Sequence, residues 1–171
     1  MAISMENVKL TGLTAFGVAA TAPRIQRYED IYENNHHRIY SLAYWMTASE
    51  VEGEELMANV FCRAFAYTAE PTQEQIDRAL VSELRELMTL GPLTLDCTPT
   101  TAGMGRNVKR IHLEEAVKQL PATERIAFLL HDVESYSHDR ISALLGLTQE
   151  ESRSAVYQAR LSIRELVSRM Y

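Results

Sequence analysis

Residues 137–148 have the sequence Ser-His-Asp-Arg-Ile-Ser-Ala-Leu-Leu-Gly-Leu-Thr, and this stretch decides the fold of the chain. Ser137 is a typical N-cap for a short helix, and Gly146 supplies the tight turn that ends it. Thr148 is the N-cap of a second helix, because Glu151 three residues later completes a capping box. This order of a short helix, a glycine turn and a capped helix predicts a helix-turn-helix, the second helix of which would contact DNA.

Two more helical patterns precede this motif. The first has a short apolar face that consists of Leu113, Ala116, Val117 and Leu120. Pro121 then begins the next helix, since its missing N–H falls where no intrahelical acceptor exists. The inward face of that helix is expected to consist of Phe128, Leu129 and Val133.

The final helix has an apolar side and a polar side. Its buried side is predicted to consist of Val156, Ala159, Ile163 and Leu166. Its other side presents Gln149, Glu150, Arg153, Ser154, Tyr157, Gln158, Arg160 and Arg164. Arg and Gln side chains can contact base edges, and Ser, Tyr and further Arg side chains can hold phosphates. The polar side could instead be the solvated face of a helical bundle, but the caps and the glycine turn favour DNA binding.

The first half of the chain is also helical by pattern. Apolar residues recur at helical spacing within residues 31–46, 56–65 and 76–87, and no comparable run of alternating apolar and polar residues occurs. Residues 91–105 are rich in Gly, Pro and Thr and hold one charge, as is typical of a linker. We therefore expect an all-α chain with two small helical domains. The expected divisions are a leader at 1–23, a first domain at 24–90, a linker at 91–105 and a second domain at 106–171.

The leader and the cysteines bear on the cellular setting. Residues 10–22 are small and largely apolar and loosely imitate a secretory signal, but they are too short to span a bilayer. A flexible or weakly helical leader, without membrane insertion, is expected. Cys62 and Cys97 have no CxxC spacing, which favours a reduced, cytoplasmic setting. Cys62 is predicted to be a small buried residue on the apolar side of its helix.

Charge is unevenly distributed along the chain. The formal net charge is -6, which would repel DNA phosphates if it were spread evenly. Residues 24–90 hold 6 Lys/Arg against 12 Asp/Glu, whereas residues 105–171 hold 10 against 9. The acidity therefore belongs to the first half, and the second half can approach a phosphate backbone.

The sequence offers little support for an enzyme. His36 and His37 are adjacent, so they point about 100 degrees apart on a helix and form no ligand set. A run of four carboxylates lacks the glycine and the alternation of a calcium loop and suits the start of a helix: Glu50, Glu52, Glu54 and Glu55. No glycine-rich phosphate loop or nucleophile motif is present in the sequence. We expect no catalytic activity, no metal and no cofactor.

Two segments resemble a known family. The sequence Leu-Pro-Ala-Thr-Glu-Arg-Ile-Ala-Phe-Leu-Leu-His-Asp-Val-Glu at residues 120–134, with the helix-turn-helix after it, resembles region 4 of the extracytoplasmic-function (ECF) sigma factors of bacterial RNA polymerase. Residues 28–43 resemble the opening of sigma region 2, and residues 54–65 are similar to its polymerase-binding helix. The resemblance covers both expected domains, in the order of the family.

The resemblance implies a non-catalytic specificity subunit of RNA polymerase. In the family, region 2 docks on the polymerase and opens the promoter at the minus 10 element, while region 4 binds the minus 35 element. The implied polymerase-binding residues are Glu54, Glu55, Leu56, Asn59 and Phe61. The implied DNA-binding residues are Thr148, Gln149, Arg153, Ser154, Tyr157, Gln158, Arg160 and Arg164. The implied partners are core RNA polymerase, promoter DNA and an anti-sigma factor.

A second interpretation stays open. The first domain is acidic, and residues 72–90 contain no aromatic side chain of the kind that stacks on unpaired bases. The chain could therefore be a sigma-like interaction protein that binds an anti-sigma factor or another regulator without initiating transcription. A related hypothesis is a compact arrangement in which the acidic first domain covers the basic face of the second.

Overall fold

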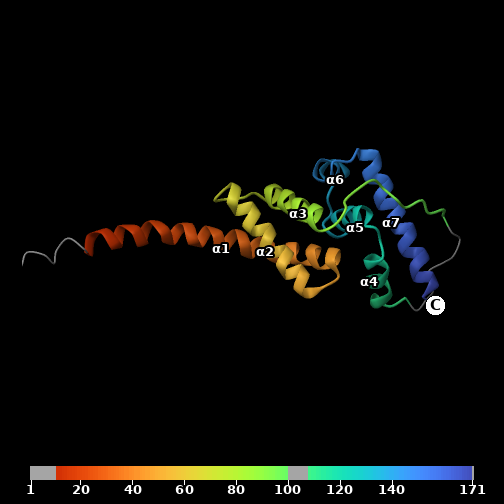
Figure 1. Cartoon of the computed structure of the whole chain (residues 1–171), viewed down its shortest axis with the longest axis horizontal. Coiled ribbons are helices and arrows are strands. Elements are labelled where there is room, and N and C mark those ends of the chain that lie inside the picture. Colours follow the sequence, from red (N-terminus) through yellow and green to blue (C-terminus); the bar gives the residue numbers. More distant parts are fainter. Residues whose placement is uncertain (1–10, 100–107, 171) are drawn as a thin grey trace, which may run out of the picture.

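The computed structural model describes residues 11–99 and 108–170, and the side chains of residues 23–99 and 108–170. Within these ranges it contains α-helices and one turn of π-helix, with no strand (Figure 1). The expected all-α fold is confirmed. None of the described helices is long and apolar enough to cross a membrane.

Three helices form the first half of the structure. Helix α1 is Thr11–Thr47, α2 is Glu50–Tyr67 and α3 is Gln73–Leu87. The N-terminal part of α1 projects from the body as a long rod, and its C-terminal part packs with α2 and α3 (Figure 1). The helix passes through Pro23 without a break, so it begins inside the segment expected to be a leader.

Local signals fix the start of each shorter helix in this half. The Ser49 hydroxyl accepts a hydrogen bond from the backbone N–H of Glu52 at 3.3 Å, which makes Ser49 the N-cap of α2. The carboxylates of Glu50 and Glu52 lie in its first turn, as the sequence predicts. Helix α3 begins with a capping box between Thr72 and Gln75.

The first half has a core at the crossing of α1, α2 and α3. Its largest fully buried side chains are Ile39, Leu42, Leu56, Ile76, Leu80 and Leu84. The prediction that Cys62 is buried is wrong, because its side chain is exposed. Helix α2 buries Leu56, Val60 and Ala64, which are four residues apart, and a residue midway between the last two faces outward.

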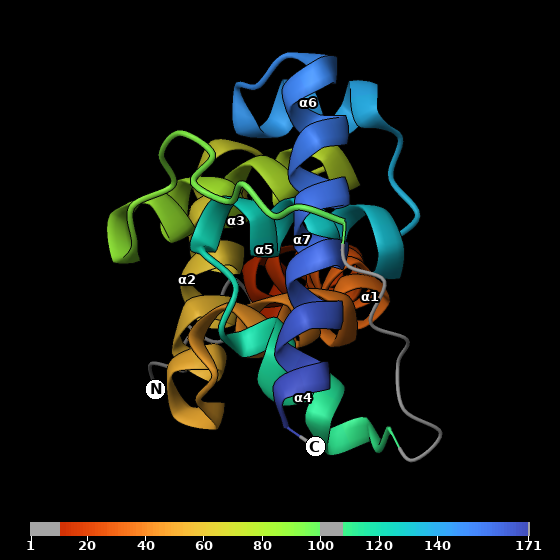
Figure 2. The ribbon, with the colours of Figure 1, turned by 90° about the vertical axis from the view of Figure 1, so that its right-hand side faces the viewer.

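The second half consists of four helices and the π-helical turn. Helix α4 is Arg110–Lys118, α5 is Ala122–Phe128, α6 is His138–Leu145 and α7 is Gln149–Arg169, with the π-helical turn at Leu129–Val133. Helix α7 is the long element of this half, and α4, α5 and α6 pack along it (Figure 2). The predicted inner side of α7 is confirmed, since Val156, Ala159 and Ile163 are buried and Leu166 is partly buried.

The three boundaries predicted around the helix-turn-helix are confirmed. The Ser137 hydroxyl accepts from the backbone N–H of Arg140 at 3.3 Å and caps α6. Gly146 ends α6 with φ at +72°, in the left-handed region that favours glycine. Thr148 and Glu151 form the capping box of α7, with the Glu151 carboxylate 2.7 Å from the Thr148 backbone nitrogen.

One expected inward residue points outward. Leu129 is buried, but Val133 is 54% exposed, so its predicted inward orientation is wrong. In the π-helical turn, the backbone N–H of Glu134 donates to the Leu129 carbonyl at 3.1 Å, one residue further along than in an α-helix. This extra residue shifts the helical phase and carries Val133 away from the core.

The segment that joins the halves lies against the second half. Glu124 of α5 accepts hydrogen bonds from the backbone N–H groups of Thr94, at 2.6 Å, and Leu95, at 2.9 Å. The backbone N–H of Cys97 donates to the Gln158 side chain of α7 at 2.6 Å. Figure 2 shows this segment crossing in front of α7. The linker is therefore held to the second half as an extended strap.

We expect Gly146→Ala to lower the free energy of unfolding by about 1 kcal/mol, because an alanine is strained at a positive φ. Urea unfolding followed by circular dichroism measures the change. Gly91→Ala is the matched control, since its φ is not positive and an added Cβ would make an ordinary 3.6 Å contact with Thr89. Equal stability of the two variants would contradict the role of Gly146.

Candidate nucleic-acid and polymerase interface

Helix α7 presents an exposed polar side at its N-terminal end. Seven of the eight residues expected to bind DNA are exposed: Thr148, Gln149, Arg153, Ser154, Tyr157, Arg160 and Arg164. Tyr157 is a large aromatic side chain that is 50% exposed. Gln149, Arg153, Tyr157, Arg160 and Arg164 follow one another at three or four positions and share one side of the helix, with Thr148 and Ser154 beside it. This surface is termed the recognition face.

The first turn of the recognition face is tied to α6. Gln149 donates a short hydrogen bond to Asp139 of α6. The Gln149 side chain also accepts a hydrogen bond from the Arg153 guanidinium at 3.3 Å. This chain of contacts places Arg153 over the N-terminal end of α7, where residues of a recognition helix meet base edges.

Arg160 is exposed but already has an anionic partner. Its guanidinium donates two hydrogen bonds to Asp132, at 2.9 Å from Nε and 2.6 Å from Nη2. Burial acts to raise the pKa of Asp132, but hydrogen bonds from Arg160 and His131 outweigh it, so the pKa lies below its usual value. Arg160 therefore anchors α7 to the π-helical turn, and its charge is offset before any phosphate approaches.

Gln158 does not belong to the recognition face, and its expected contact with DNA requires correction. Its side chain is half-buried and accepts the hydrogen bond from the Cys97 backbone. The linker lies on this part of α7, so DNA could not reach Gln158 unless the linker moved away. Cys97 belongs to the linker, and its partial burial against α7 raises the pKa of its thiol.

The residues expected to bind polymerase divide into two groups on α2. Glu54, Glu55 and Asn59 are exposed and can meet a partner. Leu56 is 1% exposed and Phe61 is 5% exposed, so both are core residues. Leu56 can meet a partner only through the pocket that it lines, and the expected contact role of Phe61 requires correction. Their burial fixes the orientation of α2 and thereby of the three exposed side chains.

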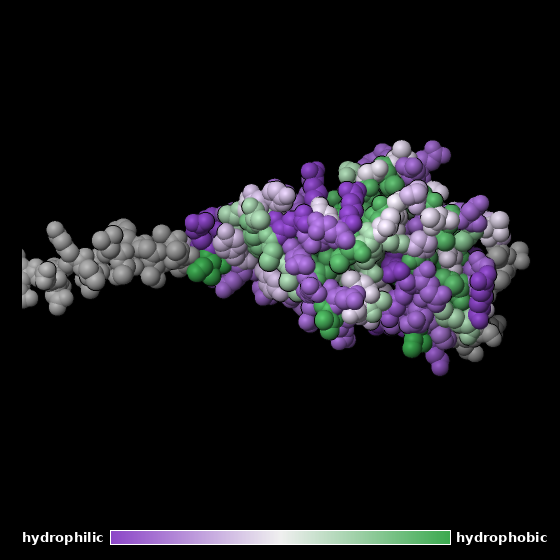
Figure 3. Space-filling model, in the orientation of Figure 1, coloured by the Kyte–Doolittle hydropathy of each residue, from purple (hydrophilic) through white to green (hydrophobic). Residues whose placement is uncertain are grey.

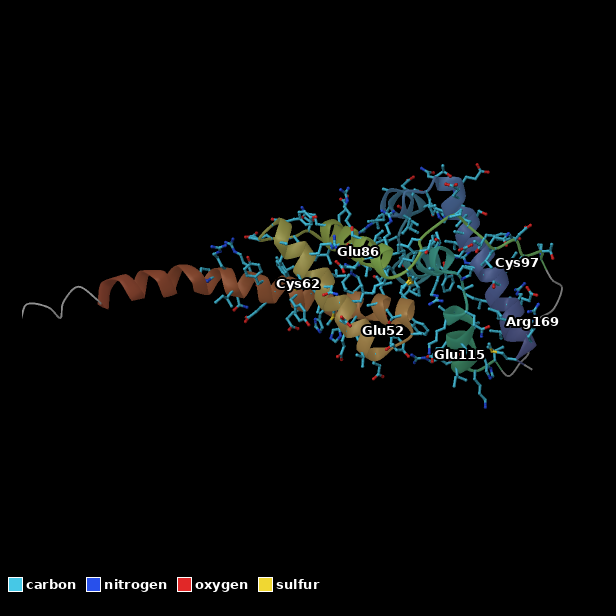
Figure 4. All side chains as sticks on the ribbon, in the orientation of Figure 1. Glu52, Cys62, Glu86, Cys97, Glu115 and Arg169 are labelled. Atoms are coloured by element: carbon cyan, nitrogen blue, oxygen red, sulfur yellow. The ribbon has the colours of Figure 1, made fainter. Side chains whose placement is uncertain are left out.

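A pocket adjoins the exposed group. It is lined by Met46, Thr47, Glu52, Glu55, Leu56, Asn59, Leu87 and Met88. Figure 4 labels Glu52 near the start of α2, and Figure 3 shows that this face of the molecule is largely hydrophilic, with smaller hydrophobic areas between. The buried Leu56 forms an apolar part of the lining, and Glu52 and Glu55 add two carboxylates to it. This arrangement suits a partner that inserts an apolar side chain beside a positive charge.

Sequence reasoning missed the contacts between the two halves. Asp77 of α3 is 2% exposed and accepts hydrogen bonds at 2.6 Å from both Arg38 of α1 and Arg140 of α6. The hydroxyl of Tyr136, in the turn before α6, also donates to Asp77 at 2.7 Å. Burial and the neighbouring carboxylate raise the pKa of Tyr136 to about 12. These four side chains are termed the Asp77 cluster.

A second contact between the halves involves Arg125 of α5. Its guanidinium donates to the Met46 carbonyl at 3.0 Å and the Trp45 carbonyl at 3.4 Å, both at the end of α1. It also donates to the carbonyls of Lys118 and Leu120. Burial lowers the pKa of Arg125, and its partners are all backbone carbonyls.

The halves are therefore in contact, as a compact arrangement requires, but the covered surface differs from the hypothesis. The first half packs against α4, α5 and α6. Arg153, Tyr157 and Arg164 stay exposed on α7. The acid of the first half that meets a base of the second is Asp77, and its partner Arg140 belongs to α6.

The described part of the chain offers no arrangement of three or more His, Cys, Asp or Glu residues that could hold a metal ion. What the geometry does offer is an exposed recognition face on α7 and an acidic surface with a pocket on α2. Both arrangements suit a macromolecular partner, which can contact an extended surface.

Comparison with known proteins agrees with this interpretation. Residues 110–163 match the family described as sigma-70, region 4. Over 176 aligned residues the chain is 21% identical to the ECF RNA polymerase sigma factor SigE of Mycolicibacterium smegmatis, covering 93% of this chain and 68% of that protein. The fold is similar to that of the sigma factor RpoE of Bartonella quintana, solved in complex with the anti-sigma factor NepR. That match has a TM-score of 0.62 at 16% identity and covers 81% of this chain and 95% of the other.

Proposed function

We propose that this chain directs core RNA polymerase to a set of promoters. The proposal is supported by the match of residues 110–163 to sigma-70 region 4 and by the similarity of the chain to ECF sigma factors in sequence and fold. In this proposal it is a specificity subunit without catalytic activity of its own. The observation that carries the proposal is the helix-turn-helix itself, with both helices capped, a left-handed glycine in the turn and an exposed recognition face. The domain divisions at residues 24–90 and 106–171 are part of the proposal.

The second half would bind the minus 35 element. The N-terminal end of α7 enters the major groove, where Arg153 contacts a base edge and Ser154 and Tyr157 lie beside the backbone. Arg164 lies about three turns along the same side and reaches a phosphate. Arg160 contributes by holding α7 through Asp132 rather than by direct contact.

The first half would bind core polymerase through α2. Glu54, Glu55 and Asn59 supply exposed charge and hydrogen-bonding groups, and the pocket beside them accepts an apolar side chain of the polymerase. The acidic character of this half suits a basic partner surface. Helix α3 would lie close to the minus 10 element.

We expect Arg153→Ala to weaken binding of the minus 35 element by about 1–3 kcal/mol, since a bidentate arginine contact to a base is lost. Fluorescence anisotropy of the polymerase complex on a labelled promoter duplex measures this change. The duplex is selected from a random library by core polymerase together with this chain. Arg169→Ala is the control on the same helix, because Arg169 pairs with Glu165 in the last turn, away from the recognition face. Equal affinity of both variants would contradict the placement of Arg153.

Run-off transcription tests the proposed function. Purified core polymerase and a selected promoter template are incubated with and without the chain. We expect a product with one fixed start site only when the chain is present. A promoter-independent product, or no product although the chain binds core polymerase, would overturn the proposal.

Two observations favour a second candidate function, a sigma-like protein that binds an anti-sigma factor without initiating transcription. On α7, Gln158 and Arg160 are occupied by contacts within the chain, and α3 carries no aromatic side chain for unpaired bases. Under this alternative, the run-off assay gives no product, and an anti-sigma factor binds tightly to the same preparation.

A further inference from the structure

The Asp77 cluster joins elements from both halves around one buried carboxylate. Besides the hydrogen bonds to Asp77, Arg38 donates to the Tyr136 hydroxyl at 2.9 Å and Gln73 donates to it at 3.1 Å. The Arg140 guanidinium lies over the Tyr136 ring, 3.7 Å from its centre. Both carboxylate oxygens of Asp77 are therefore satisfied, and two of its three donors come from the second half.

The cluster is divided unequally between the halves. Asp77 and Arg38 belong to α3 and α1 of the first half, so this pair stays together if the halves separate. Tyr136 and Arg140 belong to the second half and would be lost. Separation would expose Asp77 to water, which rehydrates its charge. The contact can thus open without leaving a buried unpaired charge in either half.

The closed form cannot reach both promoter elements. The minus 10 and minus 35 elements are about 25 base pairs apart, or about 85 Å of DNA at about 3.4 Å per base pair. Helices α3 and α6, which would lie near these two elements, are joined by a 2.6 Å hydrogen bond between Asp77 and Arg140. The halves must therefore separate before the chain can occupy both.

The linker is long enough to permit this separation. Helix α3 ends at Leu87 and α4 begins at Arg110, which leaves 22 residues between them. A fully extended chain of that length spans about 70–80 Å, and the domains add their own width. The strap contacts of Thr94 and Leu95 with Glu124, and of Cys97 with Gln158, shorten this reach in the closed form.

We propose that the Asp77 cluster is an autoinhibitory latch that holds α6 against α3 in the free chain and must open, with release of the linker strap, before the chain occupies both promoter elements. The requirement to span two promoter elements rests on the proposed function. The closed state of the free chain is independent of that function, because it follows from the contacts of the Asp77 cluster and of the linker strap.

The test measures the distance between the halves by fluorescence energy transfer. One dye is placed on Cys62, which is exposed on α2, and the other at the end of α7 through Arg169→Cys (Figure 4). Cys97→Ser removes the other native thiol and leaves the backbone N–H that bonds Gln158. Neither labelled position lies in the contact between the halves.

We expect high transfer for the parent chain in the absence of polymerase, and lower transfer for Asp77→Asn. The ratio of closed to open chain should fall about tenfold or more, since hydrogen bonds to a charged group are among the strongest in proteins. The apparent affinity for core polymerase should rise by the same factor by which the open fraction rises.

Glu83→Gln is the matched control. Glu83 lies on the same helix as Asp77 and also pairs with an arginine, but its partner Arg63 belongs to α2 of the same half. Removal of its charge should leave the transfer efficiency at the parent value. Circular dichroism of each labelled variant checks that it is folded.

A second variant covers the case in which Asp77→Asn does not fold. Arg140→Gln changes the partner of Asp77 in the second half, and the Arg140 side chain is 36% exposed. This substitution should also separate the two halves. Parent-like transfer in folded Asp77→Asn, or in Arg140→Gln, overturns the latch. Low transfer in the parent chain overturns it too. Low transfer in Asp77→Asn and Arg140→Gln, together with no run-off product, would support the latch and refute the sigma function. Failure of the latch and failure of the proposed function are therefore distinguishable.

Discussion

Arg125→Ala is expected to lower the free energy of unfolding by about 3 kcal/mol. The guanidinium donates to four backbone carbonyls, at Trp45, Met46, Lys118 and Leu120, and links α5 to the ends of α1 and α4. An alanine would leave these half-buried acceptors without the donor, and an unmade hydrogen bond at a buried acceptor costs about 1–3 kcal/mol. The expected loss is larger than that of a surface ion pair.

Urea unfolding followed by circular dichroism measures this loss. Arg110→Ala is the matched control, because Arg110 is 89% exposed and pairs with Glu114 on the same helix face. Exposed pairs of this kind contribute little, so the control should unfold at nearly the parent urea concentration. Similar midpoints for both variants would mean that Arg125 does not hold the halves together.

Ile141→Ala is expected to destabilise the chain by about 2–4 kcal/mol, through lost burial and the cavity that the smaller side chain leaves. Ile141 is 0% exposed at the centre of α6, between the second-half core and α7. The same change should weaken binding of the minus 35 element, since α6 positions the N-terminal end of α7. Thermal unfolding and anisotropy titration measure the two effects.

Ile111→Ala makes the same chemical change at an exposed position. Ile111 lies on α4 and is 59% exposed, so the substitution removes little buried area. We expect the parent melting temperature for this control. A loss equal to that of Ile141→Ala would show that the helix-turn-helix core is not the source of the stability.

The helix-turn-helix could be predicted from sequence because its signals are local. An N-cap needs one hydroxyl and the backbone N–H three residues on, and Ser137 and Thr148 provide these hydroxyls. The end of α6 needs a residue that tolerates a positive φ, which is Gly146. Helical periodicity likewise predicted the buried side of α7. Each of these features depends on residues within about three turns of one another.

Features that depend on distant residues could not be predicted in this way. Gln158 has the spacing of a recognition residue, and only the path of the linker covers it. Val133 has the spacing of a core residue, and the π-helical turn moves it outward. Asp77 lies beside the apolar stripe of α3, but its partners Arg38 and Arg140 are 39 and 63 positions away.

The close packing of α1 on α2 shows a further limit. Gly53 lies within a helix, where its propensity is poor, and the sequence gives no reason for it. A Cβ there would lie 3.2 Å from the backbone of Tyr44, so the glycine permits the two helices to approach.

We propose a sigma factor whose two halves separate before it can act. The most direct test is energy transfer between dyes on Cys62 and Arg169→Cys, in the Cys97→Ser background, in the transcribing complex with core polymerase and promoter DNA. We predict high transfer in the free chain and a single low-transfer population in the complex, because the halves must separate to span about 85 Å of DNA. High transfer in a complex that produces a run-off transcript would contradict the account.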